Sequence, residues 1–292
     1  MKEELEKMEI DNSFMDDILD TNPESVLDKV QEKFEPNVNE QRIIAELSSG
    51  NYDNLVKVLS LLNKEGNTDS ICIKDSTVNQ ASNNCIILAD MSSVLKNKLG
   101  EPVNLDILNP KKYLKLLEQF RSQDNIFIID DPENQRFILT NGEVKLFLPK
   151  QDTSEDSKEI EIFDTDNAEG ICETKIDKDM RKIIKNLSKD QERIDLLIQD
   201  NELKAIYIPE TAIYTFPEFK KDPKAQNLDE TNADISLRCS NFLPVEADNY
   251  EFFIMKSGED NYVAVTDCKV GGVIAVRVQE VLEMATGGNL IF

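Results

Sequence analysis

The chain has 292 residues, 40% of them hydrophobic, which is enough to build two ordinary domains with a core in each. Acidic residues outnumber basic ones by 24, and histidine is absent, which removes the commonest acid/base catalyst and metal ligand. Charge spread evenly at this excess would repel nucleic acid and anionic membranes.

The five cysteines are scattered and form no C-x-x-C pair, so the sequence predicts neither a disulfide framework nor a zinc site. No apolar run reaches the roughly 18 residues needed to span a bilayer, and the start, MKEELEKMEIDNS, lacks the apolar core of a signal peptide. We therefore expect a soluble cytoplasmic protein with no metal, no cofactor and no membrane contact.

Residues 1–38 alternate acids with isolated apolar residues and contain the amphipathic segment SFMDDILD. This composition is typical of a mobile acidic arm with one short helix. A helix packed on the body of the protein fits the same pattern, and proteolysis or hydrogen exchange would separate the two.

From about residue 39 onward, a helical pattern followed by three strand-like runs recurs four times. The helical patterns begin at Asn51, Asn109, Asp177 and Ser240, which lie 58, 68 and 63 residues apart. The longer middle interval contains residues 149–167, whose proline, serines and acids mark an interdomain connector. The sequence thus predicts two similar α+β domains, 39–148 and 168–282, and a flexible tail at 283–292.

In the second and third helical patterns, apolar residues spaced i, i+3, i+4 and i+7 predict one buried face. These residues are Tyr113, Leu116, Leu117 and Phe120, and then Met180, Ile183, Ile184 and Leu187. In the first helical pattern, Leu55, Val58, Leu59 and Leu62 have the same spacing and are likewise expected to share one face. Asn109 and Asp177 are expected to cap the two helices, and Pro110 suits a first turn. The fourth pattern, SNFLPVEA, has no lysine and is kept short by Pro244.

Basic residues gather on the opposite, outward faces of the first three helical patterns. They are Lys57, Lys64, Lys111, Lys112, Lys115, Arg121, Lys178, Arg181, Lys182, Lys185 and Lys189. Such faces can follow phosphates without reading bases. A single basic face would fit a solvated surface equally well, and its recurrence on three helices favours a function. Arg121 lies well around its helix from Lys111 and Lys115.

Three stretches resemble the DNA polymerase sliding clamps of T-even-type bacteriophages, which are distant relatives of the proliferating-cell-nuclear-antigen type. They are MSSVLKNKLGEPVNLDILNPKKYLKLLEQF, NIFIIDDPENQRFILTNGEVKLFLPK and NFLPVEADNYEFFIMK, and the pattern extends over residues 40–282. The resemblance implies the DNA clamp fold, in which each domain holds two β-α-β-β-β units with the helices on one face of antiparallel sheets. It also implies a homotrimeric ring whose helices line the hole, so that the eleven basic residues would face duplex DNA.

The same resemblance implies a processivity factor rather than an enzyme, acting in DNA replication in the cytoplasm of a phage host. The implied partners are duplex DNA, bound without sequence specificity, a DNA polymerase, a clamp loader and late-transcription factors. Clamps receive partner peptides near the connector, so Ile160, Ile162 and Phe163 are candidates for a pocket lining, although IEIF also fits an edge strand. The arm and an extended loop at 220–231 depart from the family, which leaves the ring stoichiometry open.

Two other functions fit parts of the sequence. A metal-dependent nuclease could use acids such as Asp130 and Asp131, although NIFIIDDPENQ is also typical of a strand ending in a turn. An acidic scaffold or DNA mimic would suit the net charge, but it predicts no clustering of lysines on repeated helix faces. Nucleotide-binding glycine loops and the H-E-x-x-H motif are absent from the sequence.

Overall fold

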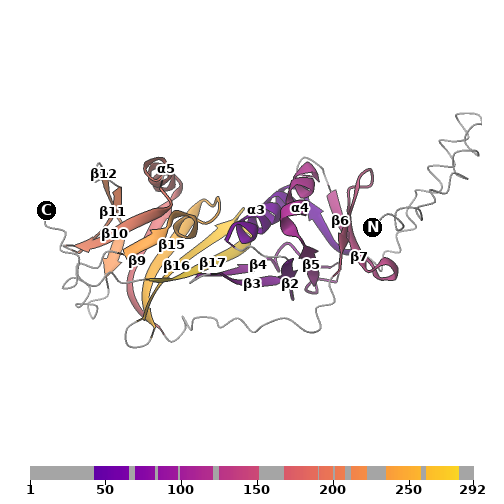
Figure 1. Cartoon of the computed structure of the whole chain (residues 1–292), viewed down its shortest axis with the longest axis horizontal. Coiled ribbons are helices and arrows are strands. Elements are labelled where there is room, and N and C mark those ends of the chain that lie inside the picture. Colours follow the sequence, from indigo (N-terminus) through magenta and orange to yellow (C-terminus); the bar gives the residue numbers. More distant parts are fainter. Residues whose placement is uncertain are drawn as a thin grey trace, which may run out of the picture. The chain divides into compact units, whose positions relative to one another are not determined.

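The structure is a computed structural model of the whole chain (Figure 1). It describes residues 43–65, 70–82, 85–97, 99–120, 125–150, 168–189, 191–199, 201–207, 212–221, 235–257 and 261–282. The predicted arm, residues 151–167 of the predicted connector and the predicted tail lie outside this set. Spatial contacts divide the chain into Met1–Ile43 and Ile44–Phe292, and the elements below belong to the second unit, apart from Ile43.

A strand, a helix and three further strands recur four times. The helix and the three strands after it follow the sequence pattern, and the opening strand agrees with the clamp fold that the resemblance implied. The first unit comprises β1 (Ile43–Ser48), α3 (Ser49–Glu65), β2 (Ser70–Ile73), β3 (Thr77–Ser82) and β4 (Cys85–Asp90). The second comprises β5 (Leu105–Leu108), α4 (Pro110–Leu117) with the 3-10 turn η2 (Glu118–Phe120), β6 (Asn125–Asp131), η3 (Pro132–Asn134), β7 (Arg136–Thr140) and β8 (Lys145–Pro149).

The second half of the chain repeats this order. The third unit comprises β9 (Glu169–Asp177), α5 (Lys178–Leu187), β10 (Arg193–Gln199), β11 (Glu202–Tyr207) and β12 (Ala212–Thr215). The fourth comprises β14 (Ile235–Arg238), α7 (Cys239–Phe242), β15 (Asn249–Ser257), β16 (Asn261–Val270) and β17 (Ile274–Leu282). An additional strand, β13 (Phe219–Lys221), contains Lys220 and Lys221, the first two residues of the predicted loop at 220–231, and the rest of that loop lies outside the described residues.

The first strand of each unit pairs with a strand of the neighbouring unit in the same half of the chain. The described sheets include the orders β1-β6-β7-β8, β2-β5 and β12-β11-β10-β14, so β1 joins strands of the second unit and β14 joins strands of the third. Reciprocally, β5 pairs with β2, and β9 pairs with β15. This exchange explains why the units occur in pairs, because neither member of a pair completes its sheets alone.

One sheet joins the two halves of the chain. Its strand order is β13-β9-β15-β16-β17-β4-β3, and its neighbouring strands run antiparallel (Figure 1). At the joint, β17 pairs with β4, with Val278 opposite Ile87. Both side chains are buried in the common core. We call this side of the sheet the helix side. Strands from both predicted domains share this sheet, and the domain limits themselves stay a prediction.

The helices pack on the core through the apolar spacing that the sequence shows. In α3, all four predicted positions, Leu55, Val58, Leu59 and Leu62, are buried. The buried hydroxyl of Tyr52 in α3 donates to the carbonyl of Leu117 at 2.9 Å, which ties α3 to the end of α4. Pairs of units therefore share a core beneath adjacent helices.

The two expected helix caps have different outcomes. Asp177 is extended, and its Oδ1 accepts from the backbone N–H groups of Asp179 at 2.9 Å and Met180 at 2.8 Å, which confirms the predicted cap of α5. Asn109 has φ 47°, in the left-handed region, and makes no side-chain cap, so that prediction is wrong. Pro110 instead occupies the first helical position, where its fixed φ suits a helix start.

The turn between β16 and β17 contains Gly271 and Gly272, and it meets α3. Gly271 has φ +59°, and a Cβ at this position would lie 1.9 Å from Nδ2 of Asn54. Glycine therefore serves both the backbone conformation and the close approach. The nearby Ser93 hydroxyl donates to the carbonyl of Val273, so this corner links the first and fourth units.

Candidate nucleic-acid interface

Helix α4 presents lysines to solvent opposite its buried residues. Lys111, Lys112 and Lys115 are all exposed. Of the four residues predicted to form the buried face, Leu117 and Phe120 are buried, and Tyr113 and Leu116 are half-buried. Lys112 Nζ lies 5.4 Å from the ring centroid of Tyr113. The first turn of the helix contains no acid, so the three ammonium groups form a local positive surface.

Helix α5 and the turn that follows it present a second set of lysines. Lys178, Lys182, Lys185 and Lys189 are all exposed. Lys182 Nζ lies 3.3 Å from Asp179 Oδ1, and since both groups are largely exposed, this ion pair contributes little to stability. The Lys182 ammonium group can therefore reorient towards an incoming anion at small cost.

Arg181 does not belong to this set, and the prediction that it projects outward is wrong. The residue is only 7% exposed, and its Nη1 lies 3.3 Å from Oε1 of Glu246, between α7 and β15. Ile184 and Ser188 are buried on the same side of the helix, whereas Ile183, assigned to the buried face, is 44% exposed. The buried face of the helix is therefore shifted from the predicted one towards Arg181 and Ser188, while Met180 and Leu187 are half-buried against the core.

Helix α3 contributes less positive charge than α4 and α5. Lys57 is half-buried. The side chain of Lys64 and the whole of Arg121 lie outside the described residues. The contribution of these two positions stays a prediction.

The helices lie on one side of the sheets. Leu61 of α3, Ile184 of α5 and Phe242 of α7 line one hollow, and α4 is bonded to α3 through Tyr52 and Leu117. The lysines of α4 and α5 therefore occur on elements that cover the same face of the protein. An array of ammonium groups on exposed helix faces binds phosphate groups without distinguishing bases.

The fourth unit adds no positive charge to this array, because α7 has only four residues. Its buried Asn241 donates to Oε2 of Glu280 at 2.8 Å, and the backbone N–H of Arg238 donates to the same oxygen at 3.3 Å. Burial, the largest cause, raises the pKa of Glu280 above its ordinary value of 4.5. This carboxylate fixes α7 on β17 and lies beneath the surface.

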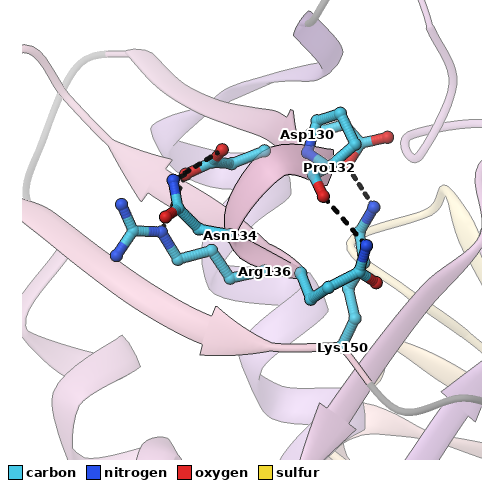
Figure 2. Close-up of polar contacts among 7 residues, drawn as sticks. Asp130, Pro132, Asn134, Arg136 and Lys150 are labelled. Atoms are coloured by element: carbon cyan, nitrogen blue, oxygen red, sulfur yellow. Dashed lines mark hydrogen bonds and ion pairs between the residues drawn. The ribbon is translucent and has the colours of Figure 1, made fainter.

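Figure 2 shows the turn between β6 and β7, where the nuclease alternative placed acidic metal ligands. Arg136 Nε lies 2.8 Å from Oδ2 of Asp131, Asn134 donates to both oxygens of the same carboxylate, and Lys150 pairs with Asp130. The hydrogen bond from Arg136, the largest cause, holds the pKa of Asp131 below its ordinary value. Both carboxylates are bound by protein donors. Within the described ranges, no group of three or more His, Cys, Asp or Glu side chains could hold a metal ion.

No family model and no curated protein sequence match this chain. Solved structures do match it. A. fulgidus PCNA, solved with the C-terminal region of FEN-1 bound, aligns with a TM-score of 0.57 and 13% identity over 84% of this chain and 100% of that one. The PCNA2–PCNA3 complex of Sulfolobus tokodaii aligns with a TM-score of 0.57 and 10% identity, covering 82% of this chain and 98% of that one. PCNA of Thermococcus kodakaraensis aligns with a TM-score of 0.55 and 14% identity, covering 82% of this chain and 99% of that one. The chain has the fold of PCNA-type sliding clamps.

The clamp fold confirms the predicted fold class, and identities of 10–14% establish that fold alone. The attribution to T-even-type phages stays a prediction. The candidate pocket residues Ile160, Ile162 and Phe163 lie outside the described residues. Among the helices that the structure describes, none is long and apolar enough to cross a membrane.

Proposed function

We propose that this protein is a sliding clamp that encircles duplex DNA without sequence specificity and tethers a replicative polymerase. The observation that carries the proposal is the set of exposed lysines on α4 and α5, on the helix side of a clamp fold. In a chain with 24 more acids than bases, this side is the one suited to phosphates. The acidic remainder discourages DNA from wrapping any other face.

Ring closure is supported by two sheet edges. β8 ends the sheet β1-β6-β7-β8, and β12 ends the sheet β12-β11-β10-β14. Each carries an apolar side chain that is unusually exposed for its type, Phe147 at 43% on β8 and Ile213 at 58% on β12. Edge strands with exposed apolar side chains are templates for pairing with another chain.

The joint inside the chain suggests how these edges pair. β4 and β17 are each the last strand of a unit, and they pair antiparallel. β8 and β12 are the last strands of the other two units. Pairing β8 of one copy with β12 of the next would repeat the same joint, and we propose that three copies close a ring in this way.

The test replaces Lys111, Lys115, Lys182 and Lys185 by alanine together. Because each side chain is exposed, the protein should fold and assemble normally, while processivity in primer extension should fall several-fold. Each lost phosphate contact should also reduce the slope of log affinity against log salt by about 0.9.

A matched control replaces four exposed lysines elsewhere on the protein: Lys96, Lys175, Lys220 and Lys269. This variant removes the same charge and should retain wild-type processivity. Equal losses in both variants, or no loss in the helix variant, would reject the proposed interface. A wild-type protein that is never retained on circular DNA would favour the acidic scaffold instead.

The partners are proposed from the same family likeness. Since A. fulgidus PCNA has been solved with the C-terminal region of FEN-1 bound, we propose that this clamp also receives peptide segments, from a polymerase, a clamp loader and late-transcription factors. Ile160, Ile162 and Phe163 are the proposed lining of that site. A phage origin and action in the host cytoplasm belong to the same proposal.

A further inference from the structure

The short helix α7 leaves a hollow on the helix side of the protein. The corresponding helices of the other units have 17, 8 and 10 residues, whereas α7 has four. Pro244 follows two residues after the end of α7 and disfavours its continuation. A hollow of about 320 Å³ remains beside α5.

The floor of this hollow is apolar. Ile184 of α5, Ile194 of β10 and Phe242 of α7 are almost fully buried, and each contributes to the lining. Leu61 of α3, Leu243 and Pro244 complete the apolar surface. The volume lies at the lower end of the range of about 300–1,000 Å³ typical of small-molecule sites.

The rim of the hollow is positive. Lys185 and Lys189 lie one helical turn apart and are both exposed. Ser188, Ser240 and the Cys239 thiol add polar groups, and none of the lining residues that the structure describes is an acid. This is an unusual composition in a chain whose acids outnumber its bases by 24.

We propose that this hollow binds small organic anions that have a flat aromatic body, with the body on the apolar floor and the negative group between Lys185 and Lys189. The inference extends the proposed function, because the same two lysines are expected to contact duplex DNA. A bound anion and DNA would therefore compete for this part of the ring surface.

The reactivity of the Cys239 thiol can report whether an anion enters the hollow. Its thiol lines the hollow and is half-buried, and burial raises its pKa. The other thiols are those of exposed Cys72 and of buried Cys85, Cys172 and Cys268. A Cys72→Ser background thus leaves Cys239 as the most accessible thiol.

The experiment compares two disulfide reagents of similar size on this background. Ellman's reagent, 5,5′-dithiobis(2-nitrobenzoate), is an aromatic dianion, and 4,4′-dithiodipyridine is neutral. With either, the Cys239 thiolate attacks one sulfur of the reagent, a mixed disulfide forms, and the other half leaves as a thiolate or thione. The Lys185→Ala/Lys189→Ala variant should slow Ellman's reagent at least roughly threefold relative to the neutral reagent, since only the anion is attracted by the rim.

The neutral reagent controls for any change in thiolate content or access that the lysine substitutions cause. If the variant slows both reagents equally, or if neither reagent modifies Cys239 in the wild-type background, the anion site is rejected. A saturating short duplex at low salt should protect Cys239. Lysine-dependent selectivity without protection would support the anion site and count against the proposed DNA path over α5, so the two proposals can fail separately.

Discussion

Glu280 is a buried carboxylate where β17, β14 and α7 meet. It accepts hydrogen bonds from Asn241 and from the backbone N–H of Arg238, and Arg193 Nη2 lies 3.7 Å from its Oε1. Despite these donors, burial raises its pKa above 4.5. The charged form is therefore less favourable in the folded protein than in the unfolded chain.

This pKa shift predicts the pH dependence of one variant. Because the folded-state pKa is raised, the stabilisation from Glu280 is fully present below about pH 4.5, its ordinary pKa, and is lost as the pH rises through the folded value. Glu280→Gln cannot titrate. The free energy of unfolding of the wild type, relative to Glu280→Gln, should therefore fall as the pH rises above about 4.5.

Urea unfolding of both proteins across this pH range measures the difference. Glu143→Gln, at an exposed position in the β7–β8 turn, serves as the control for general pH effects on the rest of the molecule. A wild-type advantage that is constant or that grows with pH would contradict the assigned role of burial.

At the scale of elements, the sequence predicted the helices and most strands because their apolar spacing is set locally. α3 buries all four predicted leucine and valine positions. The orientation of α5 was not predictable in the same way, because Arg181 turns inward to meet Glu246, which is 65 residues away in the chain. The pattern also gave no separate strand at Ile43–Ser48, since IIAELS runs directly into a helix.

The two helix starts give a paired prediction. Asp177→Ala removes a carboxylate that accepts two backbone N–H groups, so it should destabilise the protein by about 1 kcal/mol. Asn109→Gly removes no cap and relieves a side chain at φ 47°, so it should be neutral or stabilising. Thermal unfolding of the two variants and the wild type decides the matter. The expected order is reversed if Asn109 acts as the cap and Asp177 does not.

At the scale of the whole molecule, strand exchange and sheet order could not be predicted from the sequence. Alternation of apolar and polar residues shows that a strand exists and which of its faces is buried, but not which strand lies beside it. The pairing of β1 with the second unit and of β4 with β17 both depend on contacts between distant segments. For the same reason, the sequence did not reveal that β8 and β12 would end their sheets.

Those two edges carry the prediction for assembly. Ile213 is 58% exposed on β12, and covering it against β8 of a neighbouring copy would contribute up to about 1.5–3 kcal/mol per interface. Ile213→Lys would instead place a charge in that contact, so each interface should weaken by tenfold or more. Sedimentation should show a trimer for the wild type and smaller species for the variant at the same concentration. Leu99→Lys is the matched control, because Leu99 is 82% exposed in the turn after Asn97 and lies on no sheet edge. If Ile213→Lys sediments like the wild type, or if the control dissociates equally, the β8–β12 joint is not what closes the ring.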